Sequence, residues 1–345
     1  MLNQAPRFDL ADAVRAAREI YGLDATASSL PSERDQNVLL TATGGERYVL
    51  KISNRTEQRA MLEAQNGAMR HVARRVTCCQ RVLPTVGGEL IGVTPGGDHL
   101  VRLVTYLDGV PLAEISPRPP GLLDSLGRTL GRLDAALADF DHPAIHRDFH
   151  WDLANASRVI QEHLPLIGDQ DQRALLRRVS ESALAWIAPH QSAFRRSAIH
   201  NDANDWNVLV SDPLRITPNP YSLIPNPYTI SVIDFGDMVH TWTVADPAVA
   251  IAYAMLDAAD PVETAAAIVR GYHAEYPLRD EEIAAVFPLA SLRLCISACI
   301  AAWQCAQRPD DEYLAISQAP IERTLPRLAE IPLTVAAQAM RAACG

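Results

Sequence analysis

The segment HNDANDWNVLV occupies residues 200–210, and VIDFGDM follows at residues 232–238. Together they carry Asp202, Asn207 and Asp234. Phosphoryl transfer offers a protein little to bond covalently, so catalysis consists of orienting the acceptor hydroxyl and holding magnesium on the phosphates. An aspartate can accept the hydroxyl proton, while an amide and a second carboxylate supply the hard oxygens that Mg²⁺ prefers. The pattern therefore predicts a phosphoryl-transfer site with Asp202 as base and Asn207 and Asp234 as metal ligands.

Each motif also has a plainer interpretation. Asn and Asp side chains commonly cap and bend polar turns, and DFGD alone is typical of an ordinary exit from a strand. The joint pattern favours the site, because an apolar β-prone run at residues 208–210 follows the first motif and another at 230–233 precedes the second. Two adjacent strands of this kind would present both motifs at one edge.

The composition sets limits on size and partners. At 345 residues the chain is long enough for two lobes, each with its own core, and a hydrophobic content of 48% indicates a folded protein. The 31 Lys and Arg against 41 Asp and Glu give a net charge of −10. This balance argues against nucleic acid or an anionic membrane as the primary partner and suits a cationic small molecule, although it equally serves solubility.

The six cysteines form no disulfide framework and no metal-binding pattern, which predicts a reduced, cytoplasmic compartment. Cys295 and Cys299 lie one helical turn apart, but zinc would need two further ligands, and their alanine-rich surroundings favour small core residues. The N-terminal residues lack the basic start and apolar run of a signal peptide. No run of eighteen uncharged apolar residues occurs, so we expect no membrane span.

The first part of the chain mixes helix-type and strand-type patterns. The expected elements are a helix at residues 10–21, strands at 38–41 and 47–52, a helix at 57–76 and a strand at 99–106. Thr43-Gly44-Gly45-Glu46 is a good hairpin turn between the first two strands. These elements predict a small strand-rich N-lobe over residues 1–107.

Residues 108–345 are expected to form a larger, mainly helical C-lobe. The expected helices are 122–138, 170–188, 244–257, 261–275, 280–304 and 320–344. Between the two motifs, the proline-rich stretch 212–229 repeats Asn-Pro-Tyr, which predicts an extended, exposed excursion from a hairpin. The fold class expected for the whole chain is α+β.

The donor side is predicted around Lys51, at the end of the second strand. In a kinase-type lobe a strand lysine steadies the donor phosphates and an acidic residue of the next helix holds that lysine. In this chain Lys51 could form either an ion pair with Glu63 or a hydrogen bond with Gln65. The alternative for Lys51 is a solvated lysine at a strand end.

The turn expected over the phosphates, residues 31–37, contains no glycine. Backbone amides, Ser32 and Arg34 would therefore replace the glycines used elsewhere. Arg34 could equally pair with Asp35 or Glu33. Tyr106, at the end of the last strand of this lobe, completes the set assigned to the donor.

The chain resembles the aminoglycoside phosphotransferase and choline kinase superfamily, and within it most closely the hydroxylysine-kinase-type proteins. The superfamily resemblance rests on HNDANDWN and IDFGD, where Asn201 replaces the usual glycine and Ala203 a common leucine. The subfamily resemblance rests on SERDQN at 32–37, LEAQN at 62–66, VRLVTYLDG at 101–109, WDLANA at 151–156, DFGDMVH at 234–240 and RGYHAEYPL at 270–278.

This resemblance implies a bilobal, protein-kinase-like fold with the donor nucleotide between the lobes and the acceptor against the helical lobe. It implies Asp202 as base, Asn207 and Asp234 as magnesium ligands, and Lys51 on the donor phosphates. These motifs contact phosphates, so they leave both ATP and GTP as possible donors.

A small amino alcohol is cationic at neutral pH and needs carboxylates or aromatic faces near its ammonium. The candidates are Asp205, Trp206, Asp237, His240, Trp151 and Asp152. Asp237 is the best of them because it lies three residues from a metal ligand, although it could equally stabilise its own loop. Trp151 and Asp152 could instead pack and cap the start of a helix, and Arg102 or Arg147 could bind an acceptor carboxylate.

The sequence thus predicts a cytoplasmic, magnesium-dependent kinase that phosphorylates a hydroxyl of a small amine-bearing metabolite, hydroxylysine or a relative. A homoserine kinase and an aminoglycoside 3'-phosphotransferase-like kinase are alternatives of the same class. A nucleotide-binding pseudokinase is the rival from another class, whereas a Rossmann dinucleotide enzyme lacks its glycine-rich fingerprint. The oligomeric state is left open.

Overall fold

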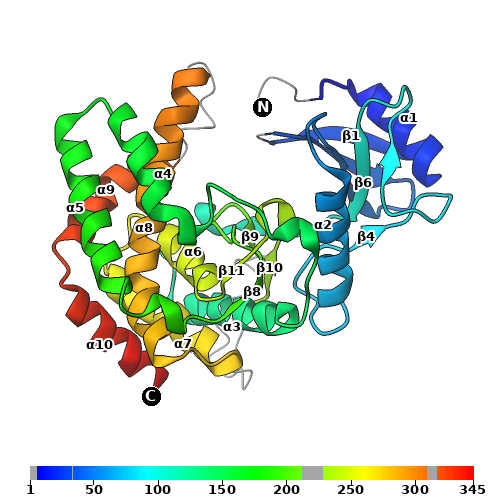
Figure 1. Cartoon of the computed structure of the whole chain (residues 1–345). Coiled ribbons are helices and arrows are strands. Elements are labelled where there is room, and N and C mark those ends of the chain that lie inside the picture. The colour runs from blue at the N-terminus through cyan, green and yellow to red at the C-terminus, as the bar shows by residue number, and fades with distance from the viewer. Residues whose placement is uncertain (1–5, 33, 212–227, 309–316) are drawn as a thin grey trace. The chain divides into compact units, whose positions relative to one another are not determined.

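The computed structural model describes residues 6–32, 34–211, 228–308 and 317–345. It divides into two compact units, Met1–Asp108 with His142–Ala144, and Gly109–Asp141 with Ile145–Gly345. The first unit is rich in strands and the second is mainly helical (Figure 1). The expected α+β, kinase-like fold class is confirmed. Most of the predicted proline-rich excursion, residues 212–227, lies outside the described residues.

The first unit is built on one antiparallel sheet. Its strands run in the order β1 (Ala25–Leu30), β2 (Gln36–Ala42), β3 (Arg47–Ile52), β6 (Leu100–Thr105) and β4 (Val82–Leu83), and β5 (Gly92–Val93) also pairs with β6. The hairpin predicted at Thr43-Gly44-Gly45-Glu46 joins β2 and β3, and Gly45 there has a φ of 92°. A positive φ costs glycine no steric strain, so this turn closes readily.

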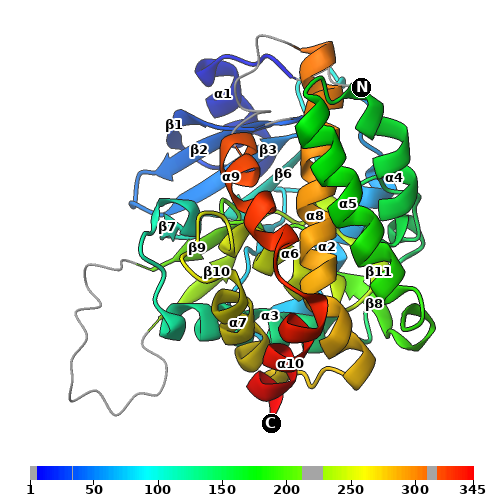
Figure 2. The same cartoon turned by 90° about the vertical axis from the view of Figure 1, so that its left-hand side faces the viewer.

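One face of this sheet packs against α1 (Leu10–Tyr21), the predicted first helix (Figure 2). Ala13, Ala16 and Ala17 are buried together with Leu50 and Ile52 of β3. Side chains alternate across a strand, so Lys51, which lies between these two residues, points to the opposite face. The packing of α1 therefore determines which face carries the lysine.

The second unit contains the five helices predicted between residues 122 and 304, one helix that was not predicted, α4, and two helices where a single one was predicted. The helices of this unit are α3 (Pro120–Leu137), α4 (Ala156–His163), α5 (Gln170–Ile187), α6 (Ala245–Ala254), α7 (Pro261–Glu275), α8 (Asp280–Gln307), α9 (Gln318–Ala329) and α10 (Leu333–Cys344). The single helix predicted at 320–344 is wrong, because the chain breaks between α9 and α10. Pro332 causes the break, since a proline disfavours helical backbone in the residue before it.

The longest helix, α8, forms the centre of this unit. It contacts α4, α5, α6, α9 and α10, and Figure 2 shows it beside α5 and α9. By length and composition α8 could cross a membrane, but its apolar window is entirely buried inside the unit. This burial is typical of the core helix of a globular unit.

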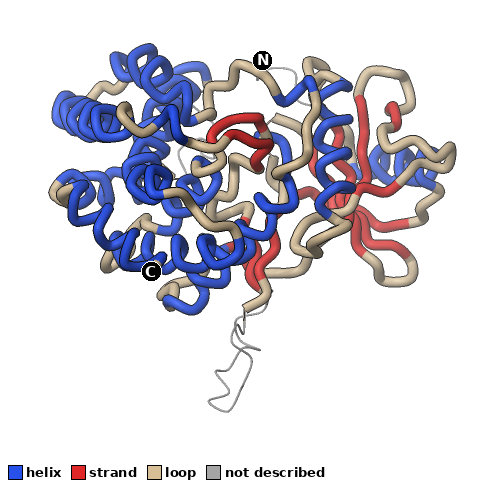
Figure 3. The backbone as a smooth tube through the Cα atoms, turned by 60° about the horizontal axis from the view of Figure 1, so that its bottom comes forward, coloured by secondary structure: helices blue, strands red, loops and turns tan. Residues whose placement is uncertain are grey.

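Two small sheets, one of three strands and one of two, lie among these helices (Figure 3). In the first, β9 (Val208–Val210) pairs with β10 (Ile230–Val232) and with β7 (Val110–Pro111), and in the second β8 (Arg196–Ile199) pairs with β11 (Val239–Trp242). Val232 lies opposite Val208, so the end of β10 meets the start of β9. The prediction that both motifs meet at one edge is confirmed.

Two buried acids, Asp134 and Asp246, lie next to the first motif. Asp134 of α3 and Asp246 of α6 are both 0% exposed, and the Tyr272 hydroxyl donates to Asp134 Oδ2 at 2.6 Å. Burial, reinforced by the charge of Asp246, raises the pKa of Asp134 well above its ordinary value. Folding therefore favours the protonated form of Asp134.

The raised pKa of Asp134 predicts that Asp134→Asn changes how the free energy of unfolding depends on pH. An unfolded aspartate titrates near a pKa of about 3.9, so the stability that protonated Asp134 contributes is present below that pH and is lost as pH rises through its raised folded pKa. The asparagine side chain has the shape of the uncharged aspartic acid and does not titrate. Relative to wild type, the variant should gain up to about 1.4 kcal/mol per pH unit in this window.

The measurement is the free energy of urea unfolding for both proteins at several values between pH 6 and pH 9. A constant difference across this range would show that Asp134 is already ionised in the folded state.

Candidate phosphotransfer site

The first motif leaves β8 at His200, whose side chain is buried. Its Nε2 lies 3.0 Å from the Ile233 carbonyl oxygen, and its ring meets Phe235 edge to face at 5.0 Å between centroids. Burial lowers the pKa of His200, so the ring is neutral and donates from Nε2. Nδ1 then accepts from the backbone nitrogen of Asp202 at 3.3 Å. One histidine thus holds the two motifs together.

Asn201 has a φ of 65°, in the left-handed region. Its backbone nitrogen donates to Asp246 Oδ1 at 2.6 Å, and its Nδ2 donates to the Asp237 carbonyl oxygen at 3.2 Å. Glycine adopts this backbone without strain, and asparagine is among the few other residues that tolerate it. The replacement of the superfamily's usual glycine by Asn201 is therefore compatible with the turn and adds a contact to the second motif.

The predicted base, Asp202, is oriented by donors on both carboxylate oxygens. Oδ1 accepts from Asn204 Nδ2 at 3.0 Å and from Arg293 Nη2 at 3.1 Å, and Oδ2 accepts from Asn207 Nδ2 at 2.7 Å. The side chain is 20% exposed. Burial, followed by the charge of Asp237, raises the pKa of Asp202 to about 8 while Arg293 opposes the shift. A carboxylate with raised proton affinity suits a general base.

The two predicted metal ligands present suitable oxygen atoms. The side-chain Nδ2 of Asn207 donates to the backbone carbonyl oxygen and to Oδ2 of Asp202. The side-chain oxygen Oδ1 of Asn207 is therefore the atom that could bind a cation. Asp234 has a φ of 66°, and its Oδ1 accepts from the Gly236 nitrogen at 3.0 Å. A carboxylate and an amide oxygen fit Mg²⁺, which takes its remaining ligands from water and substrate phosphates.

Asp237, the leading acceptor candidate, is buried close to the base. The carbonyl oxygens on either side of it, at Gly236 and Met238, accept from Arg147 Nη2 at 3.1 and 3.0 Å. Arg147 was a candidate for binding an acceptor carboxylate, and the structure uses it to hold the DFGD loop. The role of Asp237 toward an acceptor stays a prediction.

Two neighbouring candidates have different surroundings. Asp205 is 7% exposed, and its carboxylate pairs with Arg118 Nη2 at 3.2 Å. Trp206 is 37% exposed and presents its ring to solvent. Asp205 is therefore committed to an internal ion pair, which argues against its prediction as an acceptor ligand, whereas Trp206 offers an accessible aromatic surface.

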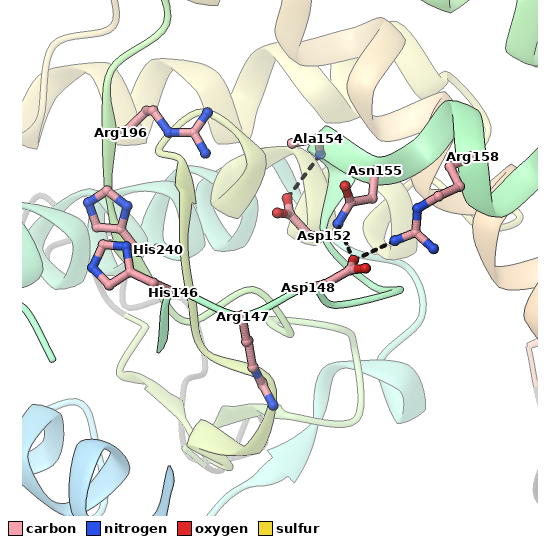
Figure 4. Close-up of a pocket in the computed structure, with 9 residues that line it drawn as sticks. All are labelled: His146, Arg147, Asp148, Asp152, Ala154, Asn155, Arg158, Arg196 and His240. Carbon is pink, nitrogen blue, oxygen red and sulfur yellow. Dashed lines mark hydrogen bonds and ion pairs between the residues drawn. The ribbon is translucent and has the colours of Figure 1, made fainter. Parts of the chain in front are cut away.

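His240 and Asp152 belong to a pocket of about 530 Å³ that Asp202 does not line (Figure 4). The pocket is lined by His146, Arg147, Asp148, Asp152, Ala154, Asn155, Arg158, Arg196 and His240. Asp152 accepts from the Ala154 nitrogen and from Thr241 Oγ1, and thereby caps a short 3₁₀ helix, Leu153–Asn155. Its capping role, left open by the sequence, is the one that the structure supports.

The predicted donor-binding residues lie in the first unit. Lys51 is 8% exposed and faces Asn37 of β2 and Arg102 of β6 in register. On α2 (Arg59–Val72), Gln65 is buried, while the Glu63 side chain is exposed and makes no ion pair within the described residues. The structure therefore does not support an ion pair between Lys51 and Glu63, because Glu63 lies on the solvent face of α2, and the donor role of these residues stays a prediction.

The remaining donor candidates lie at the margins of the sheet. Ser32 and Arg34 are exposed in the turn between β1 and β2. Tyr106 follows β6, and its ring lies 4.6 Å from the Arg47 guanidinium carbon. Arg102, the other candidate for an acceptor carboxylate, is 3% exposed and donates to Asn66 Oδ1 at 3.2 Å, so it is part of the interior of this unit.

The fold and this set of residues define a kinase-type phosphotransferase that acts on a hydroxyl acceptor. The chain belongs to the phosphotransferase enzyme family, whose family model matches residues 26–282. It is 30% identical over 340 residues to a hydroxylysine kinase of Danio rerio, covering 94% of this chain and 93% of the relative. A hydroxylysine kinase of Bos taurus is 30% identical over 333 residues, covering 90% and 87%.

Solved structures show the same fold. Amicoumacin kinase hAmiN, in complex with AMP-PNP, Ca²⁺ and Ami, has a TM-score of 0.67 at 16% identity over 94% of this chain and 95% of that one. A microcompartment-associated aminopropanol kinase has a TM-score of 0.66 at 20% identity over 97% and 99%. The GDP complex of aminoglycoside 2'-phosphotransferase-IIIa has a TM-score of 0.61 at 15% identity over 93% and 99%. The chain is thus a small-metabolite kinase.

The left-handed backbone of Asn201 predicts unequal effects of two substitutions. Asn201→Gly should keep stability and turnover within a few-fold of wild type, because glycine adopts this φ freely. Asn201→Val should cost about 1–2 kcal/mol of stability and lower kcat, because a β-branched residue is strained at this φ and would displace Asp202. Urea unfolding and steady-state kinetics measure both effects, and equal behaviour of the two variants would contradict the strain argument.

Proposed function

We propose that this kinase phosphorylates the hydroxyl of hydroxylysine or a closely related amino alcohol in the cytoplasm, with a magnesium-bound nucleoside triphosphate as donor. The observation that carries the chemistry is the 2.7 Å hydrogen bond from Asn207 to the carboxylate of Asp202, which links the predicted base to a predicted metal ligand. The acceptor class is supported by the full-length similarity to relatives named hydroxylysine kinase.

In the proposed reaction, the hydroxyl oxygen of the acceptor attacks the γ-phosphorus in line with the bond to the bridging oxygen. The new oxygen–phosphorus bond forms as the bridging bond breaks, and the nucleoside diphosphate leaves with the electron pair. The hydroxyl proton passes to the carboxylate of Asp202. The fixed orientation of that carboxylate keeps the proton acceptor in place during transfer.

Asn207 and Asp234 would hold Mg²⁺, which offsets the negative charge of the donor phosphates when bound. Lys51 would steady the same phosphates from the strand-rich unit. The structurally similar kinases include complexes with AMP-PNP and with GDP, so both ATP and GTP belong in the test.

The assignment of the base and the metal ligand predicts the effects of two isosteric substitutions. Asp202→Asn removes the proton acceptor and should lower kcat by about 10²–10⁴-fold. Asp234→Asn removes the anionic metal ligand and should shift the Mg²⁺ dependence of turnover to higher concentration as well as lower kcat. Kinetics over a Mg²⁺ series, with circular dichroism to confirm folding, measure both effects. A folded Asp202→Asn variant with near-normal kcat would refute the role of the base.

The acceptor is tested by a panel of hydroxylysine, homoserine, ethanolamine, choline and kanamycin, each with ATP and with GTP. We expect the highest kcat/KM with hydroxylysine or a close amino alcohol, measured as nucleoside diphosphate release and phosphorylated product. Preference for homoserine or kanamycin would replace the proposed acceptor. Nucleotide-dependent thermal stabilisation without consumption of triphosphate would instead indicate a pseudokinase.

A further inference from the structure

Arg293 lies in the interior of the second unit, and the proposed function leaves it without a role. It belongs to the central helix α8 and is 1% exposed. Arginine is almost never fully buried unless it is paired, because the charge loses its hydration. The surrounding sequence, Ala290-Ser291-Leu292 and Leu294-Cys295, offers no acidic partner. The residues that bind Arg293 must therefore come from other elements.

Three other segments surround the guanidinium. Nη2 donates to Oδ1 of Asp202 at 3.1 Å, and Nη1 donates to the Trp151 carbonyl oxygen at 3.1 Å. The guanidinium carbon lies 4.3 Å from the centre of the Trp151 ring and 5.8 Å from that of Tyr253 on α6. One terminal nitrogen thus donates to the predicted base, and the other donates to the segment that leads into α4.

These contacts exclude a direct role for Arg293 in binding the acceptor. Its side chain is enclosed, both terminal nitrogens already donate to protein oxygens, and aromatic rings lie against the guanidinium. An acceptor carboxylate could reach it only by displacing Asp202 or the Trp151 segment. Its effect on the reaction must therefore pass through the groups that it holds.

A second ion pair involving α8, between partly exposed Arg195 and buried Glu282, provides a structural comparison. Arg195 Nη2 lies 2.7 Å from Glu282 Oε2, and the Arg195 guanidinium carbon lies 4.4 Å from the Tyr276 ring centre. Glu282 also accepts from the backbone nitrogen of Arg279 and so caps the start of α8. In this pair the acid has a structural task, whereas the acid paired with Arg293 is the predicted base.

We propose that Arg293 is a positioning residue for phosphoryl transfer, which fixes the Asp202 carboxylate by holding Oδ1 from the rigid core helix α8. With Arg293 and Asn204 on Oδ1 and Asn207 on Oδ2, rotation of the carboxylate would break a hydrogen bond on either side. A site supported by a packed helix is more accurately placed than one supported by a loop alone. The inference rests on the proposed role of Asp202 as base.

Arg293→Met tests this role because it keeps much of the side-chain volume and removes both donors. We expect kcat to fall by about 10²-fold, since a misplacement of about 1 Å at a reacting group has an effect of this size. KM for the nucleotide should change less than two-fold. Arg293→Lys keeps the charge, but an ammonium lacks the planar fork that reaches both oxygens, so it should restore kcat only in part.

Arg195→Met is the matched control, because it breaks a second arginine–acid pair that involves α8, in which the arginine is partly exposed and the acid, Glu282, lies in neither motif. It should lower stability as Arg293→Met does while leaving kcat near the wild-type value. Methylguanidine added to an Arg293→Ala variant should restore part of the lost kcat and none of that lost in Asp202→Asn. If Arg293→Met fails to fold, Arg293→Lys and the rescue experiment carry the test.

The outcomes separate this inference from the proposed function. Wild-type turnover with any acceptor, combined with equal kcat for folded Arg293 and Arg195 variants, would overturn the positioning role and leave the kinase assignment standing. Absence of both acceptor phosphorylation and basal triphosphate hydrolysis in the wild-type protein would overturn the proposed function, and the positioning role with it. A selective loss of kcat in the Arg293 variants, with methylguanidine rescue, supports the inference.

Discussion

The hydrogen bond from the backbone nitrogen of Asn201 to Asp246, 2.6 Å long and fully buried, is the contact on which the catalytic loop depends. It fixes the chain in the left-handed turn that directs Asp202 away from β8. A buried carboxylate is costly unless its oxygens are satisfied. The backbone nitrogen of Asn201 meets that need at Oδ1 of Asp246, and burial raises the pKa of the neighbouring Asp134 of α3, so α3 and α6 together support the loop.

The second constraint is the antiparallel register of β9 and β10. Val232 of β10 faces Val208 of β9. The next residue along the chain, Ile233, therefore lies beside Asn207, and its backbone nitrogen donates to the Asn207 backbone carbonyl oxygen at 2.9 Å. The approach of the two motifs therefore follows from a short strand pair in which Val208, Val210, Ile230 and Val232 are β-branched.

The parts that could be predicted from sequence are those encoded locally. The apolar flanks of the motifs predicted β9 and β10, and helical periodicity predicted α1, α3, α5, α6, α7 and α8. The roles of Asp202, Asn207 and Asp234 stay predictions. The strand β1 was missed because Ala25-Thr26-Ala27-Ser28-Ser29-Leu30 lacks the apolar alternation of a half-buried strand. Arg293 was missed because 91 residues separate it from Asp202, and only the folded chain joins them. Its signal in the sequence was a single cation within the apolar run of α8.

The site also concentrates negative charge, since burial raises the pKa of Asp202 and the charges of Asp237 and Asp234 raise it further. Three acids so close together oppose folding, and a neutral replacement for any of them would relieve that repulsion. The buried positive charge of Arg293 offsets part of this repulsion, at a position that water does not reach. The helix that carries Arg293 is otherwise hydrophobic, and its apolar window is buried inside the unit, so the guanidinium is held within the core.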